Sequence, residues 1–397
     1  MTAVALLGLM CAALGVPVAL AAGYLGLLAI GARHRPPRAG CDDTRFDIIV
    51  PAHNEADGLP ATLQSLAALD YPATRHRIIV VADNCTDETA DVARAHGVHV
   101  LERQDPTRRG KGYALDLAFA RSATDGFADA VVVVDADSTL SRGALRAFAA
   151  VFADGAQAAQ ADYRVRNAED SWRTQLLEYA FTLHHTVRSL GRDRRGWSSG
   201  LRGNGMAFRL DTLARVPYAA FSVVEDIEYG LQLGLAGIPV RYVPDAEVLG
   251  DMPVAGDAGA RAQRARWEEG RKTLRRQWRA PLWRATLAGR PLVGDLLADL
   301  LVPPLVSLAM AVALGLLAAA GLAALGAPGW TLGPWLFAGA SVALYAARGL
   351  QLVRDPGATL RALTRLPAFV AWKLLGRREQ AAARRGEWVR TARRAQS

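Results

Sequence analysis

The chain has 397 residues, of which 51% are apolar and 21% charged, with a formal net charge of +9. This composition is too apolar for two ordinary soluble domains and too polar for a protein built of membrane spans throughout. The three cysteines, an odd number without metal-type spacing, indicate a reduced compartment and no disulfide framework.

The first 31 residues contain no Asp, Glu, Lys, Arg or His. A helix needs about 20 apolar residues to cross a bilayer, so the stretch from Val4 to Ile30 predicts a transmembrane helix. A cleaved signal peptide fits poorly, because no basic segment precedes the run and the run is too long. We assign residues 1–31 to this helix and residues 32–43 to a basic linker.

From Phe46 onward, short β-rich runs alternate with amphipathic helical segments. Such alternation predicts an α/β domain, which we place at residues 44–250, with a mostly parallel sheet and helices on both faces. The expected strands are 46–51, 77–82, 99–102 and 130–135, and the expected helices are 59–69, 86–95 and 112–121.

Acidic residues gather where three of these strands end. Glu55 follows the first strand, Asp83 follows the second, and Asp135 and Asp137 follow the fourth. Ligands of such sheets bind at the carboxyl ends of the strands, so these residues predict one site, although each alone could be a helix cap or a turn residue. Asp135 and Asp137 would repel each other without a cation, and paired carboxylates suit Mg²⁺ or Mn²⁺.

Lys111 lies between two glycines, ahead of the fourth strand. Glycines there free backbone amides, and the lysine can reach a phosphate. The segment is not a Walker loop, because the upstream glycine and the following Ser or Thr are missing. A plain loop is the alternative.

The stretch from Leu300 to Ala347 again lacks Asp, Glu, Lys, Arg and His, and Gly326–Gly329 divides it into two apolar halves. It predicts a transmembrane hairpin, which gives about three spans in all. The C-terminal assignments are interfacial helices at 251–295, the hairpin at 296–352, an interfacial segment at 353–376 and a basic cytosolic tail at 377–397.

Arginines flank these spans on one side only. The positive-inside bias therefore predicts a multi-pass protein of the inner (plasma) membrane, with residues 32–295 and the tail in the cytosol. The net positive charge indicates attraction to anionic membrane lipids rather than binding to nucleic acid.

Six motifs occur in an order that resembles the family 2 glycosyltransferases. The resemblance covers about residues 44–280, and the nearest branch contains the cellulose, hyaluronan, chitin and poly-N-acetylglucosamine synthases and the ceramide glucosyltransferases. The motifs are Pro51-x-x-Asn54-Glu55, Asp83-Asn84, Gly110-Lys111-Gly112, Asp135-x-Asp137, Glu225-Asp226 and Gln263-x-x-Arg266-Trp267.

This resemblance implies a GT-A fold, a nucleotide-diphosphate sugar as donor (a UDP-sugar by preference) and inversion at the anomeric carbon. It implies that Asp83 holds the uracil, with Glu55 near the base and ribose. Asp135 would reach the ribose or diphosphate, and Asp137 would bind the metal together with Asp135.

On the acceptor side, the resemblance makes Asp226 the catalytic base, with Glu225 beside it. It places an acceptor-side loop near Asn204, between two glycines that allow close approach. It also implies that Gln263, Arg266 and Trp267 meet the diphosphate and the acceptor end.

The chemistry of inversion requires such groups. A base must take the proton of the acceptor hydroxyl, and positive charge must stabilise the leaving diphosphate. Asp226 begins a helical segment, where its alternative role is a helix cap. Gln263, Arg266 and Trp267 share one helix face by their spacing, although that helix could instead be an amphipathic segment on the membrane surface.

Three spans are few for a polymer channel. We therefore predict transfer of one sugar, or a few, to a lipid-linked or glycan acceptor in envelope or exopolysaccharide synthesis. A processive synthase working with partner subunits is the alternative. A sugar nucleotidyltransferase and a non-catalytic membrane scaffold are less favoured, the first because its glycine-rich N-terminal loop is missing and the second because it has no need of acids at three strand ends.

Overall fold

The computed structural model describes residues 2–33, 36, 40–252 and 258–368, and over 258–267 it describes the backbone alone. An eight-stranded sheet lies at the centre, with strand order β3-β2-β1-β4-β7-β6-β8-β5. The strands are β1 Phe46–Ala52, β2 His76–Asp83, β3 His99–Arg103, β4 Ala130–Val133, β5 Ser138–Leu140, β6 Ala158–Val165, β7 Met206–Arg209 and β8 Val240–Gly250.

The four strands expected from the sequence are all present and form one parallel half of the sheet. Strand β1 pairs in parallel with β2 and β4, and β2 pairs in parallel with β3. In the other half β6 and β8 are parallel, but β7 runs antiparallel to both β4 and β6, and β5 runs antiparallel to β8. The sheet is therefore mixed. The antiparallel strands were not predicted, because the sequence pattern up to residue 135 carries no information on the later strands.

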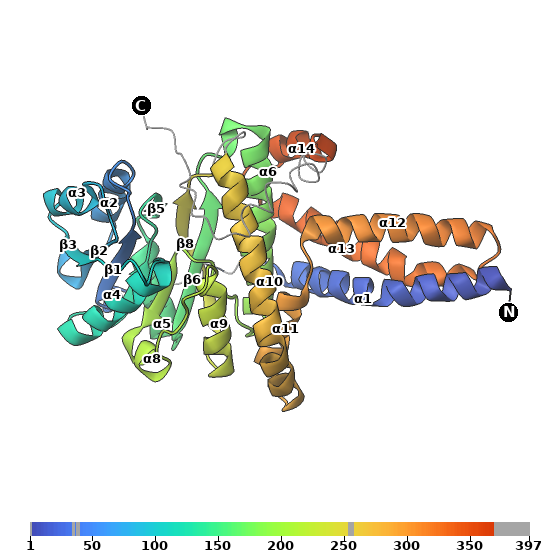
Figure 1. Cartoon of the computed structure of the whole chain (residues 1–397), viewed down its shortest axis with the longest axis horizontal. Helices are drawn as coiled ribbons and strands as arrows, with labels where there is room; N and C mark the ends of the chain where they lie inside the picture. The colour runs from blue at the N-terminus through green and yellow to red at the C-terminus, as the bar shows by residue number, and fades with distance from the viewer. Residues whose placement is uncertain (1, 34–35, 37–39, 253–257, 369–397) are drawn as a thin grey trace.

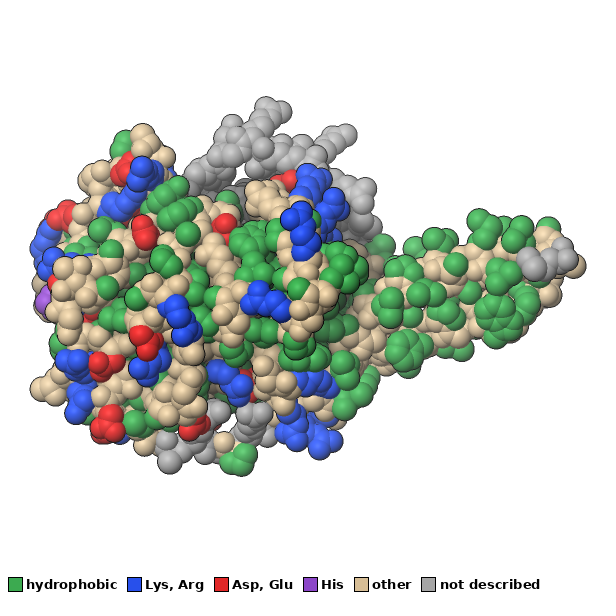
Figure 2. All heavy atoms as spheres, turned by 90° about the horizontal axis from the view of Figure 1, so that it is seen from below, with side chains coloured by type: hydrophobic (Ala, Val, Ile, Leu, Met, Phe, Trp, Pro, Cys, Tyr) green, Lys and Arg blue, Asp and Glu red, His purple; other side chains and the backbone are tan. Residues whose placement is uncertain are grey.

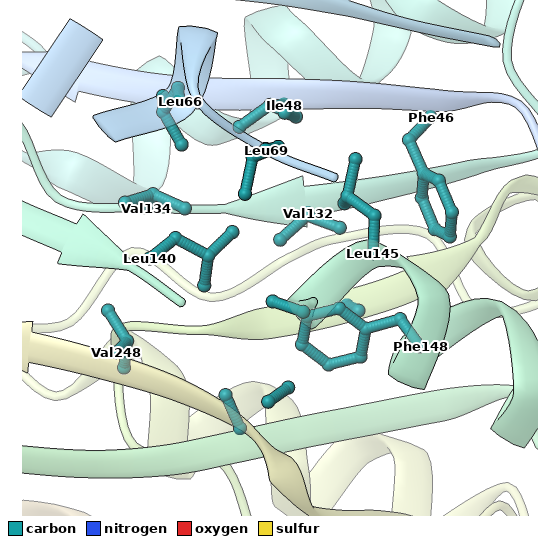
Figure 3. Close-up of a cluster of buried hydrophobic side chains, with 14 of the residues drawn as sticks. Phe46, Ile48, Leu66, Leu69, Val132, Val134, Leu140, Leu145, Phe148 and Val248 are labelled. Atoms are coloured by element: carbon teal, nitrogen blue, oxygen red, sulfur yellow. The ribbon is translucent and has the colours of Figure 1, made fainter. Parts of the chain in front are cut away.

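The two faces of the sheet bury separate apolar clusters. In β1, Ile48 packs into one cluster and its neighbour Ile49 into the other. Figure 3 shows the first cluster, in which Ile48 of β1 is the register partner of Val132 of β4 and Phe148 comes from helix α5. Strands covered on both sides need apolar side chains at every position, and this explains the continuous runs in β1 and β4.

Helices cover these faces and continue toward the C-terminus. The expected helices at 59–69, 86–95 and 112–121 correspond to the first three of the following set. The helices of the body are α2 Leu59–Ala67, α3 Thr89–Ala95, α4 Lys111–Asp125, α5 Ala144–Ala153, α6 Trp172–Phe181, the π-helix Thr182–Val187, α7 Arg188–Asp193, α8 Leu210–Arg215, α9 Glu225–Leu235, α10 Ala258–Leu287 and α11 Pro291–Leu301, with short 3₁₀ turns at Ala73–Arg75 and Ala168–Asp170.

Three long helices project from the body as a bundle, with the N-terminus at its far tip (Figure 1). They are α1 Ala3–Gly31, α12 Leu305–Ala324 and α13 Gly333–Leu352. A 3₁₀ turn at Gly329–Leu332 precedes α13, and a short helix, α14 Pro356–Leu363, follows it. Figure 2 shows the bundle covered by apolar side chains, while the charged ones lie on the body.

Two described helices, α1 and α12, are long and apolar enough to cross a membrane, where the sequence predicted about three. Helix α13 lies alongside them but is less apolar and carries Arg348 near its end. The contacts within the bundle are close: an added Cβ on Gly315 of α12 would lie 2.1 Å from the Trp335 ring of α13. Small residues at helix contacts are typical of membrane bundles.

Candidate active site

The paired acids Asp135 and Asp137 lie in the turn between β4 and β5. Asn204 orients this turn, because its Oδ1 accepts the backbone N–H of Asp135 at 3.1 Å and its Nδ2 donates to Ser138 Oγ at 2.8 Å. The Ser138 hydroxyl in turn donates to Asp137 Oδ1 at 3.0 Å. Asn204 is fully buried, so its side chain positions the acidic turn.

Lys111 supplies the positive charge beside these acids. It is the first residue of α4, and its ammonium donates to the Asp135 carboxylate and to the backbone carbonyl of Gly203. The Glu225 carboxylate lies 3.9 Å from the same nitrogen. Burial alone would lower the pKa of Lys111, but Asp135 and Glu225 raise it above its ordinary value. The lysine therefore stays charged and joins two predicted parts of the site.

Glu225 and Asp226 open helix α9, whose N-cap position is held by Val224 with no side-chain cap. Asp226 is therefore not the capping residue of this helix. Burial raises the pKa of both carboxyl groups above the ordinary range, with Lys111 opposing the shift. Asp226 also lies against the backbone of Gly203, where an added Cβ would stand 3.5 Å from its Oδ2 atom. A carboxylate of raised pKa suits proton abstraction.

On the neighbouring strand, Asp83 ends β2 with its side chain 8% exposed. Arg103 Nη1 donates to Asp83 Oδ1 at 2.7 Å, and Asn84 Nδ2 donates to the same oxygen at 3.0 Å. Sequence reasoning missed Arg103, although its place at the end of the third strand was a usable signal. Glu55 follows β1, and its backbone N–H donates to Thr89 Oγ1 at 2.9 Å.

The order β2-β1-β4 makes these strand ends neighbours along one edge of the sheet. Asp83, Glu55 and the Asp135 turn thus lie on the same edge, as the sequence predicted, and Lys111 connects that edge to α9. The structure thus brings the acids that follow these strands to one edge of the sheet. The individual roles of these residues stay predictions.

The three residues Gln263, Arg266 and Trp267 lie on α10, but their side chains are outside the described residues. The helix passes next to the start of α9: an added Cβ on Gly270 would lie 3.2 Å from Val224, the residue before Glu225. Helix α10 therefore runs beside the candidate base.

The two carboxylates predicted to bind a metal ion are those of Asp135 and Asp137. Among the described residues, no group of three or more His, Cys, Asp or Glu side chains could hold one unaided. The donor set fits a hard cation such as Mg²⁺ or Mn²⁺ if phosphate oxygens of a substrate complete its coordination.

Known proteins resemble this chain in sequence and in fold. The model of the family described as Glycosyltransferase like family 2 matches residues 44–270. Probable glycosyltransferase YdaM of Bacillus subtilis is 26% identical over 235 residues, 57% of this chain and 55% of that protein, so the chain spans about half the length of this relative. The 4,4'-diaponeurosporenoate glycosyltransferase of Staphylococcus aureus is 37% identical over 95 residues, 24% of each chain.

Among solved structures, the mannosyltransferase PcManGT from Pyrobaculum calidifontis, in complex with GDP-Man and Mn²⁺, has a TM-score of 0.55 at 19% identity. The superposition covers 91% of this chain and 98% of that one, and at this identity it shows the GT-A fold alone. Since the family model matches more than half of the chain, the chain belongs to the family 2 glycosyltransferases.

Proposed function

We propose that this chain is a membrane-bound inverting transferase that moves a sugar from a nucleotide-diphosphate sugar, with UDP as the leaving nucleotide, to a lipid-linked or glycan acceptor in envelope or exopolysaccharide synthesis. The observation that carries the proposal is the contact of three groups in one place. The charged Lys111 touches Asp135 of the acidic turn and lies near Glu225 of the buried acid pair. These contacts bring a cation and the acid pair of α9 together beside the acidic turn, which supports a site where a diphosphate and an acceptor hydroxyl would meet.

On the donor side, Asp83 and Glu55 would hold the nucleoside, while Asp135 and Asp137 would hold Mg²⁺ or Mn²⁺ together with the diphosphate. The metal would supply positive charge to the leaving group. Lys111, at the start of α4, would add a second positive charge next to the same phosphates. In support, PcManGT carries GDP-Man and Mn²⁺ on the same fold.

On the acceptor side, Asp226 would take the proton of the acceptor hydroxyl while the oxygen attacks the anomeric carbon. Its burial next to Glu225 favours this role, because the raised pKa makes the carboxylate a stronger base. Gln263, Arg266 and Trp267 of α10 would meet the diphosphate and the acceptor end. The apolar bundle would hold the enzyme, and a lipid acceptor, in the inner membrane with the body in the cytosol.

The test separates chemistry from donor binding. Asp226→Asn keeps the size of the side chain but cannot accept the proton, so transfer should fall by about 10²–10⁴-fold. Affinity for UDP with Mn²⁺, measured by calorimetry, should change less than about tenfold. Asp83→Ala should do the reverse and weaken nucleotide binding first, because it removes the partner of Arg103 at the end of β2.

The substrates for this test are a panel of UDP-sugars with the full-length protein in detergent. Asp211→Asn is the control, since this exposed residue lies on α8 and its only ion pair among the described residues is with Arg209. If Asp226→Asn loses nucleotide affinity yet keeps its transfer rate at saturating donor, Asp226 is a binding residue and the assignment of the base is wrong. Glu225 would then be the next candidate.

A further inference from the structure

A cluster of arginines lies where the body meets the bundle. We call Arg188, Arg192, Arg202 and Arg271 the arginine cluster. The first two come from α7, Arg202 from the loop before β7, and Arg271 from α10. The π-helix Thr182–Val187 runs directly into α7, and such local widening of a helix is frequent at functional sites.

Half of the cluster is neutralised by two aspartates of α11. Arg192 donates to Asp295 Oδ2 through Nε at 2.8 Å and through Nη2 at 2.6 Å. Asp299 accepts from Arg188 at 3.0 Å and lies 3.3 Å from Arg192. Arg192 is completely buried, and a buried charge of this kind must be paired.

Asp295 and Arg188 connect the body to the bundle. Tyr24 of α1 donates its hydroxyl to Asp295 at 2.8 Å, and Arg188 Nε donates to the Tyr345 hydroxyl of α13 at 3.2 Å. The paired arginines and aspartates therefore connect the body to the base of α1 and α13. Their role is structural.

The other half has no such partner. Among the residues that the structure describes, neither Arg202 nor Arg271 forms an ion pair, and the Nε atom of each is buried without a hydrogen-bond partner. Arg202 Nη2 donates to the carbonyl oxygens of Ser199 at 2.9 Å and His184 at 3.4 Å, and Nη1 lies 3.5 Å from Nε2 of the His184 ring.

Burial and the neighbouring guanidinium groups destabilise the charged forms of Arg202 and Arg271. Burial lowers the pKa of Arg202 to about 10, with Arg192, Arg188 and Arg271 adding to the effect and Asp299 opposing it. Burial also lowers the pKa of Arg271. Arg188 and Arg275 add to this shift, and Asp299 and Asp226 oppose it. An anion placed between the two side chains would remove this penalty.

Arg202 and Arg271 are sequence neighbours of glycines that contact the start of α9. Arg202 directly precedes Gly203, which lies against Asp226, and Arg271 directly follows Gly270, which packs on Val224. Both arginines also act electrostatically on Asp299 at the base of the bundle. The two arginines thus adjoin segments that contact the start of α9, and each interacts electrostatically with Asp226.

We propose that Arg202 and Arg271 bind a phosphate group carried by the lipid acceptor, and so place that acceptor between the apolar bundle and Asp226. The inference rests on the proposed function and specifies its acceptor as an anionic phospholipid-type molecule. Guanidinium groups bind phosphate with two parallel hydrogen bonds, which would use the unpartnered Nε atoms. The alkyl part would lie along the uncharged surface of the bundle (Figure 2).

The test measures binding directly, with dodecyl phosphate as the probe and the full-length protein in neutral dodecyl maltoside micelles. Dodecanol is the uncharged matched probe and inorganic phosphate the soluble one. We expect dodecyl phosphate to bind, dodecanol to show no binding, and inorganic phosphate to bind at least about 100-fold more weakly, since it lacks the buried chain.

Arg202→Gln and Arg271→Gln should each weaken dodecyl phosphate binding at least about tenfold, a loss in the usual range for a charged hydrogen bond. Arg276→Gln is the matched control, because Arg276 lies on the exposed side of the same helix. It should change the affinity less than about twofold. Binding of UDP with Mn²⁺ should be retained in all three variants, which also reports that they are folded.

If a glutamine variant does not fold, Arg202→Lys and Arg271→Lys replace it, keeping the charge but losing the second hydrogen bond. They should weaken binding about threefold or more, and unchanged affinity in them would overturn the proposal. Loss of UDP affinity with dodecyl phosphate binding unchanged would assign the arginines to the donor diphosphate. Inorganic phosphate binding as tightly as dodecyl phosphate would exclude a lipid as the source.

Failure of the inference and failure of the proposed function give different results. If UDP binding and sugar transfer are normal but dodecyl phosphate does not bind, only the phosphate site is wrong. If dodecyl phosphate binds in the expected pattern but no UDP-sugar is turned over, the phosphate site stands and the transferase assignment falls.

Discussion

At the scale of single residues, the two acids of the turn after β4 have different surroundings. Asp135 forms the ion pair with Lys111, whereas Asp137 accepts the Ser138 hydroxyl. The structure therefore already gives Asp135 a positive partner. Asp137 is the better single residue with which to test for a metal, because changing it leaves the Lys111 contact in place.

Asp137→Asn should lower sugar transfer by about 10²–10⁴-fold, because the leaving diphosphate loses a charged ligand of its metal. Chelation should abolish transfer by the unmodified enzyme, and added Mg²⁺ or Mn²⁺ should restore it. The exposed Asp91→Asn on α3 is the control, since it alters only a surface pair with Arg94. Full activity in excess EDTA would show that no metal is needed.

The sequence predicted which acids share the site but not how they are held. Asp83 and Asp135 could be placed together because each ends a strand of a parallel sheet. The contacts of Asp135 with Lys111 and Asn204 join residues 24 and 69 positions apart, and no local periodicity reports such contacts. Arg202 and Arg271 come from separate segments of the chain. That neither has an ion-pair partner among the described residues can be seen only in the folded structure.

At the scale of elements, the contact between α7 and α1 fixes the bundle to the body. Gly191 of α7 lies so close to α1 that an added Cβ would stand 2.3 Å from the Leu28 carbonyl oxygen. Backbone atoms cannot yield as a flexible side chain can. Helix α1 was predictable from its apolar run, but α7 and this crossing point were not, because they lie in a polar segment and the crossing depends on one glycine.

Gly191→Ala should destabilise the protein by about 1–3 kcal/mol, the usual cost of overpacking. Thermal unfolding followed by tryptophan fluorescence in detergent would measure a lower Tm. The matched control is Gly321→Ala in α12, where an added Cβ meets nothing within 4 Å. That variant should be equal or higher in stability, since alanine favours a helix. A similar Tm for both variants would contradict the assigned contact.

At the scale of the whole molecule, charge and apolar surface are separated. The bundle presents apolar side chains, and the body carries the acids and the basic residues (Figure 2). The N-terminus lies at the tip of the bundle, and so does the connection between α12 and α13 (Figure 1). If the bundle crosses a membrane, that tip and the body must lie on opposite sides.

The positive-inside rule then predicts which side each occupies. The connection at Gly326–Gly329 carries no charge, whereas arginines such as Arg33 and Arg348 lie at the body end of the helices. The body, with its candidate active site, should therefore face the cytosol. The basic tail at 377–397 is outside the described residues, and the same rule predicts that it too is cytosolic.

Cysteine labelling in intact cells tests this orientation. Cys11, Cys41 and Cys85 are all free thiols, so they are first replaced by serine. A reporter cysteine at Gly329, where an added side chain meets nothing within 4 Å, should react with a membrane-impermeant maleimide. Reporters at the exposed Asp91 of α3 and at the C-terminal Ser397 should react only after the cells are opened. Labelling of the Asp91→Cys variant in intact cells, with the Gly329→Cys variant protected, would reverse the topology, and the proposed use of cytosolic nucleotide sugars would then be wrong.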